Sequence, residues 1–185
     1  MRVVGGEFRG RALVAPPGRE TRPTTDRLRQ TVFDILMHGH REAVVGARVL
    51  DLFAGTGALG LEALSRGAAY ALFVEDAVPA RGAIRANIEA LGLTGRTRVF
   101  RRDATHLGPA GTVAPFGLVF ADPPYGKGLA EQALASARDG GWLTDDALVV
   151  IEEAEGAEIG AIPGLSPLDR RTVGDTQLVF LKRTG

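Results

Sequence analysis

Cysteine is absent from this 185-residue sequence, lysine occurs only twice, and aromatic residues make up 6% of the chain. Without cysteine the chain cannot form disulfides, zinc–thiolate sites or iron–sulfur clusters, and it cannot use a cysteine nucleophile. No apolar run approaches the roughly 18 residues that a membrane-spanning helix needs, and the N-terminus lacks the apolar core of a signal peptide. We therefore expect a soluble cytoplasmic protein with no membrane attachment.

The charge of the chain is balanced overall but unevenly distributed. Hydrophobic residues make up 45% and charged residues 24%, as in an ordinary globular domain. The net charge of zero taken alone argues against a nucleic-acid partner. Residues 1–30, however, carry seven arginines against three acidic residues, a net charge of +4 that leaves −4 for the remainder. Because arginine suits bidentate phosphate contact, this opening segment is a candidate nucleic-acid surface.

Short apolar runs alternate with helical patterns along most of the chain. We expect strands at 48–52, 71–75, 97–101, 117–121 and 147–151, and a terminal antiparallel pair at 170–173 and 177–181. Helices are expected at 25–39, 58–66, 79–91 and 129–138, and a small hairpin between Val3-Val4 and Ala12–Val14. This alternation predicts an α/β fold with a doubly wound, mostly parallel sheet and an N-terminal hairpin and helix extension.

A glycine-rich turn follows the first expected strand. Gly55, Gly57 and Gly60 fit G-x-G-x-x-G, which allows a tight turn, close approach of the backbone to a ligand and a helix N-terminus aimed at it. Asp51 precedes this loop, where a carboxylate would repel a pyrophosphate but can accept a hydrogen bond from an ammonium group. A strand-end cap is the alternative role for Asp51.

A second acidic residue suggests which cofactor the loop holds. Glu75 ends the second expected strand, at the position that binds ribose hydroxyls in dinucleotide folds, although Asp76 beside it could take that role. A cofactor with a ribose and an ammonium group but no phosphate is S-adenosylmethionine. Asp103, after the third strand, could accept from its adenine amino group while the backbone amide of Ala104 meets a ring nitrogen.

The most specific motif is Asp122-Pro123-Pro124-Tyr125, directly after the fourth expected strand. The prolines have no backbone N–H, so their carbonyls and the Asp122 carboxylate form an acceptor-only cradle suited to an NH₂ group. Tyr125 offers a flat face on which a flipped-out base can stack. Acceptors that hold an exocyclic amine direct its lone pair at a methyl group, so we predict Asp122 to Tyr125 as the catalytic residues.

These motifs together resemble a known family. Asp122 to Tyr125 is similar to the signature of methyltransferases acting on adenine N6 or guanine N2, and the stretch 51–63 resembles the cofactor motif of the RsmD family. The same family is resembled by Val3-Val4-Gly5-Gly6, Arg9-Gly10-Arg11, Arg22-Pro23-Thr24-Thr25-Asp26-Arg27, Gly141-Trp142-Leu143 and Ile151-Glu152-Glu153. Its members are bacterial guanine-N2 methyltransferases of small-subunit (16S) ribosomal RNA.

The resemblance implies a fold, a reaction and a set of residues. It implies a class I methyltransferase domain at 24–185 with seven strands, the last antiparallel, and an RNA-binding hairpin extension at 1–23. The implied cofactor is S-adenosylmethionine, and the implied partner is ribosomal RNA or an assembling small subunit, with no metal and a monomeric enzyme. The resemblance assigns cofactor binding to Gly55, Gly57, Glu75 and Asp103. Our further candidate cofactor residues are Asp51, Phe53, Thr56 and Ala104.

Five residues of the basic segment and the first helix are candidate RNA contacts. They are Arg9, Arg11, Arg22, Thr24 and Arg27. The last three could instead contact the cofactor, or form a helix cap with solvated arginines. Two other functions stay open: an adenine-N6 methyltransferase acting on RNA or DNA, and a dinucleotide-dependent oxidoreductase or noncatalytic nucleotide-binding module.

Overall fold

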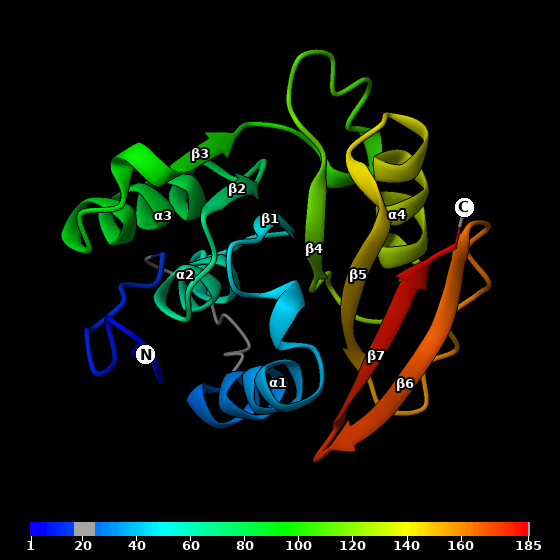
Figure 1. Cartoon of the computed structure of the whole chain (residues 1–185), viewed down its shortest axis with the longest axis horizontal. Coiled ribbons are helices and arrows are strands. Elements are labelled where there is room, and N and C mark those ends of the chain that lie inside the picture. The colour runs from blue at the N-terminus through cyan, green and yellow to red at the C-terminus, as the bar shows by residue number, and fades with distance from the viewer. Residues whose placement is uncertain (17–24, 185) are drawn as a thin grey trace.

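A seven-stranded sheet forms the centre of the computed structural model, which describes residues 1–16 and 25–184 (Figure 1). Its order is β3-β2-β1-β4-β5-β7-β6. The strands are β1 (Arg48–Leu52), β2 (Tyr70–Val74), β3 (Thr97–Phe100), β4 (Phe116–Ala121), β5 (Leu143–Ala154), β6 (Leu165–Val173) and β7 (Thr176–Arg183). The first five are parallel, and β7 runs antiparallel to both β5 and β6. The predicted fold class is confirmed.

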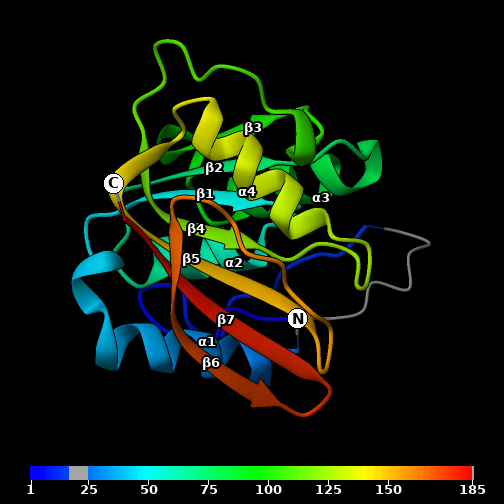
Figure 2. The ribbon, with the colours of Figure 1, turned by 90° about the vertical axis from the view of Figure 1, so that its right-hand side faces the viewer.

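Helices cover both faces of the sheet, as the nearly continuous apolar strands require. The helices are α1 (Asp26–Gly39), α2 (Ala58–Ser65), α3 (Val78–Ala90) and α4 (Leu129–Asp139), with short 3₁₀ turns η1 (Arg41–Ala43), η2 (Thr94–Arg96) and η3 (Ala104–His106). Residues of α1, α2 and α3 share one apolar cluster with Phe73, Phe120 and Phe180. Residues of α4 share the other with Val119, Val149 and Leu181. Figure 2 shows α4 above β5 and β7, whereas α1 lies in the lower part of the view, behind β6.

Two strands begin earlier than the sequence pattern predicts. β5 begins at Leu143 rather than Ala147, because Leu143 pairs with Phe116 before a register shift, and β6 begins at Leu165 rather than Arg170. The added stretches contain polar and turn-forming residues. None of the helices in the part of the chain that the structure describes is long and apolar enough to cross a membrane.

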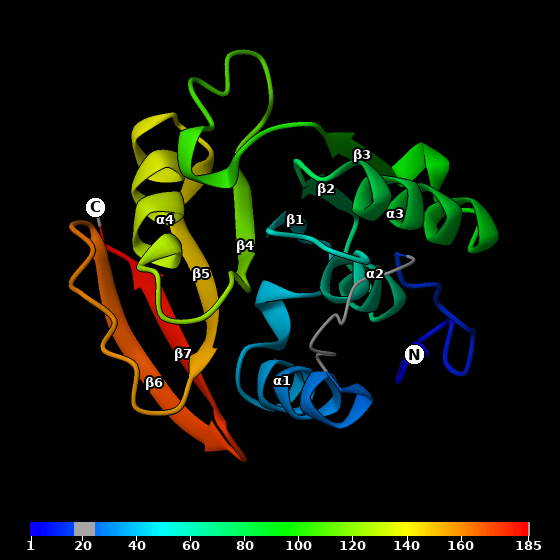
Figure 3. The ribbon, with the colours of Figure 1, turned by 180° about the vertical axis from the view of Figure 1, so that it is seen from behind.

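The predicted N-terminal hairpin forms, although its pairing is short. Its bridge joins Arg2 to Ala12, and Val3 N donates to Arg11 O at 3.0 Å. Val3 and Leu13 are buried in the apolar cluster of α1, α2 and α3. In the following, residues 1–16 are called the N-terminal segment, which lies beside α2 (Figure 3). The predicted boundary at residue 23 lies outside the described residues.

A buried carboxylate fastens the N-terminal segment to α2. Glu62 is fully buried and accepts four hydrogen bonds, two on each oxygen. The donors are Val4 N at 2.9 Å, Gly5 N at 2.9 Å, Arg29 Nε at 3.2 Å and Arg66 Nε at 2.9 Å. Because all four acceptor positions are used, these hydrogen bonds offset the free-energy cost of burying the carboxylate. They also join the N-terminal segment, α1 and α2.

Candidate functional site

Three of the predicted acidic residues come together at the carboxyl ends of adjacent parallel strands. Asp51 lies in β1, Glu75 follows β2 and Asp122 follows β4. Burial raises the pKa of Asp51 well above its ordinary range, and the negative charges of Asp122 and Glu75 raise it further. In open α/β sheets this edge is where ligands bind, so the structure gathers the predicted residues where a cofactor site is expected.

The glycine loop between β1 and α2 has a left-handed backbone at three positions. The φ angles are 57° at Phe53, 60° at Gly55 and 80° at Gly57. Phe53 is the one non-glycine residue with a positive φ among those described, and such strain of order 1–3 kcal/mol clusters at functional sites. A Cβ at Gly55 would meet nothing within 4 Å, so the loop has an open side there.

Close packing explains the third glycine of the motif. A Cβ at Gly60 would lie 2.5 Å from the Phe73 ring, so only glycine lets α2 sit this close to β2. The Gly60 N–H donates to Asp51 Oδ2 at 3.0 Å. Asp51 therefore anchors the first turn of α2, and its carboxylate remains a candidate acceptor for an ammonium group.

Glu75, a predicted cofactor residue, also holds the glycine loop in place. Its Oε2 accepts from Gly55 N at 2.9 Å and its Oε1 from Ala77 N at 3.2 Å. Only 8% of the residue is exposed. Each carboxylate oxygen can accept a second hydrogen bond, so the geometry is compatible with ribose hydroxyls as donors. The exposed Asp76 follows it in the chain.

Asp103 caps the η3 turn beyond β3. Its Oδ1 accepts from the Thr105 hydroxyl at 2.7 Å and from Thr105 N at 2.8 Å, and these two bonds hold the pKa of Asp103 below its ordinary range. The side chain is 53% exposed, with Oδ2 3.3 Å from His106 Nδ1. The carboxylate is thus ionised and accessible at neutral pH, as an acceptor for an amino group must be. Ala104 is buried beside it.

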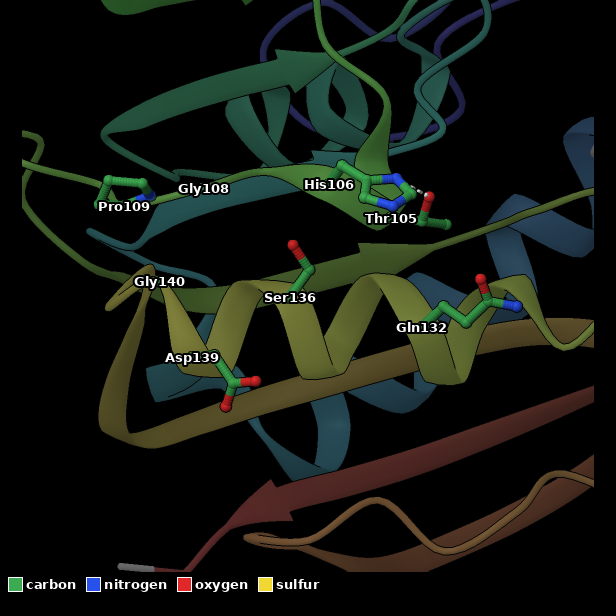
Figure 4. Close-up of a pocket in the computed structure, with 8 residues that line it drawn as sticks. All are labelled: Thr105, His106, Gly108, Pro109, Gln132, Ser136, Asp139 and Gly140. Carbon is green, nitrogen blue, oxygen red and sulfur yellow. Dashed lines mark hydrogen bonds between the residues drawn. The ribbon is translucent and has the colours of Figure 1, made fainter.

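An open cleft of about 670 Å³ lies beside this turn, between the η3 region and α4 (Figure 4). It is lined by Thr105, His106, Gly108, Pro109, Gln132, Ser136, Asp139 and Gly140. None of the predicted site residues that the structure describes lines it. The cleft therefore borders the Asp103 turn without being the predicted site.

The Asp122-Pro123-Pro124-Tyr125 motif is held against β5 and β7. Pro123 is buried and Pro124 exposed. The Tyr125 hydroxyl lies 3.0 Å from the Thr176 hydroxyl at the start of β7. The motif is thus braced at its far end by the β6–β7 hairpin.

Glu153 braces the same loop from β5. It is 4% exposed, and its Oε1 accepts from Gly126 N at 3.1 Å, directly after the motif. No sequence pattern pointed to this role, because the contact spans 27 residues. The acidic pair Glu152-Glu153 after an apolar run was the available signal.

Asn87 is a further residue that sequence reasoning missed. It is 2% exposed on α3, and its Nδ2 donates to Val14 O and to Thr56 O, both at 3.0 Å. Its Oδ1 accepts from Val14 N at 2.8 Å. Asn87 therefore joins the N-terminal segment to the glycine loop, at the predicted cofactor residue Thr56.

The candidate RNA contacts lie on more than one element. Arg9 and Arg11 are exposed on the N-terminal segment, where Arg11 Nη2 also donates to Ala90 O at 2.7 Å. Arg27 is exposed in the first turn of α1. Arg22 and Thr24 lie outside the described residues. Within residues 1–16 and 25–184 no group of three or more His, Asp or Glu side chains is arranged to hold a metal ion.

Comparison with known proteins assigns the chain to a family. Residues 1–182 match the family described as Conserved hypothetical protein 95. The chain belongs to this family. Within it, the chain is 41% identical over 175 residues to Ribosomal RNA small subunit methyltransferase D of Escherichia coli strain K12, covering 94% of this chain and 84% of that protein. The family resemblance found in the sequence is confirmed.

Other members of the family agree in sequence and in structure. The methyltransferase D of Haemophilus influenzae is 31% identical over 176 residues, which cover 94% of this chain and 89% of that protein. The solved structure of the Escherichia coli protein yhhF, described as a methyltransferase, superposes with a TM-score of 0.83 at 36% identity. That match covers 100% of this chain and 98% of the other.

Proposed function

We propose that this protein is an S-adenosylmethionine-dependent methyltransferase that modifies the N2 amine of a guanine in 16S ribosomal RNA. The observation that carries the proposal is the position of Asp122-Pro123-Pro124-Tyr125, next to the glycine loop and its carboxylates at one edge of the sheet. The names of the family members cited above support the RNA substrate. With that substrate the enzyme would act in the cytoplasm, and we propose that it acts as a monomer.

The proposed cofactor fits the acceptors that the structure presents. When bound, S-adenosylmethionine supplies a methyl group activated by a positively charged sulfur. Asp51 would receive its ammonium group and Glu75 its ribose hydroxyls, with Phe53, Gly55, Thr56 and Gly57 surrounding the remainder. Asp103 would accept from the adenine amino group, with the backbone amide of Ala104 meeting a ring nitrogen.

The catalytic motif would act by orienting the target amine. Asp122 and the carbonyls of the proline pair accept the N–H bonds of guanine N2, so that its lone pair faces the methyl carbon. The cofactor would supply its methyl carbon to N2 and leave as S-adenosylhomocysteine, with sulfur keeping the electron pair of the broken carbon–sulfur bond. One N2 proton then leaves toward Asp122 or water. Tyr125 would stack on the base and fix its plane.

RNA affinity would come from the opening of the chain. We propose that Arg9, Arg11, Arg22, Thr24 and Arg27 contact phosphates, so that residues 1–23 serve as an RNA-binding extension of a methyltransferase domain at 24–185. Phosphate contacts of this kind give affinity and register, while the base pocket gives the chemistry.

The replacement Asp122→Ala tests the proposal. Transfer of tritiated methyl groups to small subunits that lack the modification should fall about 100-fold or more, because an oriented acceptor at the reacting amine is lost. Binding of S-adenosylhomocysteine, measured by calorimetry, should change little. Lys127→Ala, an exposed residue just beyond the motif, is the matched control. Normal methylation by Asp122→Ala would refute the mechanism.

A further inference from the structure

Glu152 is a buried carboxylate for which the proposed mechanism has no use. It lies in β5, is 4% exposed and stands opposite Leu178 of β7. Both Leu178 and Val150, two residues earlier in β5, belong to the apolar cluster on the α1 side of the sheet. Glu152 thus places a carboxylate near the end of a largely apolar strand, at the edge where the predicted site lies.

The strand register places Glu152 beside Asp122. β4 and β5 are parallel neighbours in which Phe120 pairs with Val150 and Ala121 pairs with Ile151. The residues that follow this last pair are Asp122 and Glu152. Because side chains alternate along a strand, each of them lies on the face of the residue two positions earlier, which is the face of Phe120 and Val150.

An independent observation supports this face for Asp122. Asp51 pairs with Phe120 across β1 and β4, which puts it on the same face, and the charge of Asp122 acts on the Asp51 carboxyl. In Figure 1 β1, β4 and β5 follow one another across the sheet. Asp122 and Glu152 therefore follow the last pair of two neighbouring strands, at the edge that holds the predicted base site.

Two adjacent carboxylates match guanine and oppose adenine. The Watson–Crick edge of guanine presents N–H donors at N1 and at N2, whereas adenine presents donors at N6 and an acceptor lone pair at N1. An ionised carboxylate accepts hydrogen bonds and cannot donate one. A carboxylate facing N1 would accept a hydrogen bond from guanine N1–H and would repel the lone pair of adenine N1. Both effects favour guanine over adenine.

We propose that Glu152 determines the base specificity of the site by accepting the N1–H of the target guanine while Asp122 holds the N2 amine. This inference rests on the proposed function, which supplies the exocyclic amine as the reacting group. The two carboxylates would then contact neighbouring atoms of one base edge. Asp122 orients the N2 nucleophile, and Glu152 distinguishes guanine from other bases at N1.

The test compares two bases in the Glu152→Gln variant. Small-subunit RNA is prepared with guanine or with 2-aminopurine at the modified position; 2-aminopurine keeps the N2 amine but has a lone pair at N1. For the wild type we expect kcat/KM to favour guanine by about 10- to 100-fold, the usual worth of such a base contact. In Glu152→Gln the rate on guanine should fall by a similar factor while that on 2-aminopurine is kept or rises, because the amide can donate to N1.

Two further variants separate recognition from folding. Glu152→Asp keeps the charge and should keep the preference for guanine even where both rates fall. Glu153→Gln changes the neighbouring residue, whose side chain holds Gly126 N, and should lower both rates by one common factor. The ratio of the two rates therefore reports base recognition, whereas a structural defect moves both rates together.

The outcomes distinguish this inference from the proposed function. If Glu152→Gln leaves the guanine rate unchanged, or lowers both rates equally, Glu152 does not read the base although the enzyme methylates guanine. If the wild-type protein transfers a methyl group to neither RNA while binding S-adenosylhomocysteine, the proposed substrate is wrong and the role of Glu152 falls with it.

Discussion

Asp51 lies fully buried in β1, facing the charges of Asp122 and Glu75 at the same edge of the sheet. Its raised pKa means that the folded protein holds this proton to a higher pH than the unfolded chain does. The ionised form therefore costs stability, and this cost grows as the pH rises through the raised pKa. A residue kept under such conditions is typical of a binding site, where function opposes stability.

The replacement Asp51→Asn should raise the stability of the protein and weaken cofactor binding. The amide oxygen can still accept from Gly60 N, so the variant should gain about 1 kcal/mol of stability at neutral pH and bind S-adenosylhomocysteine about tenfold or more weakly. The gain should vanish in acid, below the ordinary aspartate pKa of about 4. Thermal unfolding from about pH 3 to 8 measures the stability effect, and calorimetry measures the binding effect. Asp145→Asn, at an exposed position, is the control; an equal gain there would remove the explanation.

At the scale of elements, the attachment of the N-terminal segment to α2 depends on one carboxylate. Replacing Glu62 by Gln places an amide nitrogen against donors and leaves the charges of Arg29 and Arg66 without their buried partner. We expect the free energy of unfolding in urea to fall by about 3 kcal/mol, as when one member of a buried ion pair is removed. Glu42→Gln, exposed in η1, should change it by less than about 0.5 kcal/mol. Equal effects in the two variants would contradict this account.

The elements themselves could be predicted wherever local pattern decides them. The apolar runs at 48–52 and 117–121 become β1 and β4, because a strand covered on both faces must be apolar throughout. The beginning of β5 could not be predicted, because the strand is extended by the distant pair of Leu143 with Phe116, and Thr144–Asp146 lie in the irregular stretch between that pair and the pair of Leu148 with Leu118.

The candidate site shows the same division. The spacing of glycines, the end of the second strand and the Asp-Pro-Pro-Tyr motif are local features, and from them the sequence predicts Gly55, Glu75 and Asp122 as site residues. Asn87 and Glu153 could not be found this way. Each acts through one hydrogen-bonding side chain on a partner distant in sequence, and a single polar residue in a helix or strand carries no periodic signal.

For the whole molecule, the balanced charge divides between the basic N-terminal segment and the acidic edge of the sheet. Reversing Arg9 and Arg11 to Glu should weaken RNA binding and lower the slope of log K against log salt by about 1.5, because about two phosphate contacts are lost. Filter binding across a salt series measures both. The double reversal of Arg170 and Lys182, exposed on β6 and β7, makes the same change in net charge. If it lowers the slope as much, binding depends on total charge and not on this segment.

The long reach of the N-terminal contacts has a consequence for the order of folding. Val4 bonds to Glu62, 58 residues away, and Val14 to Asn87, 73 residues away. During synthesis at roughly 5–20 residues per second the segment therefore waits several seconds for its binding surface to be made. The N-terminal segment is thus synthesised before the helices α2 and α3 to which it attaches. We expect these contacts to form after the main barrier of folding; weakening them should then speed the unfolding of the finished protein and leave its folding rate nearly unchanged.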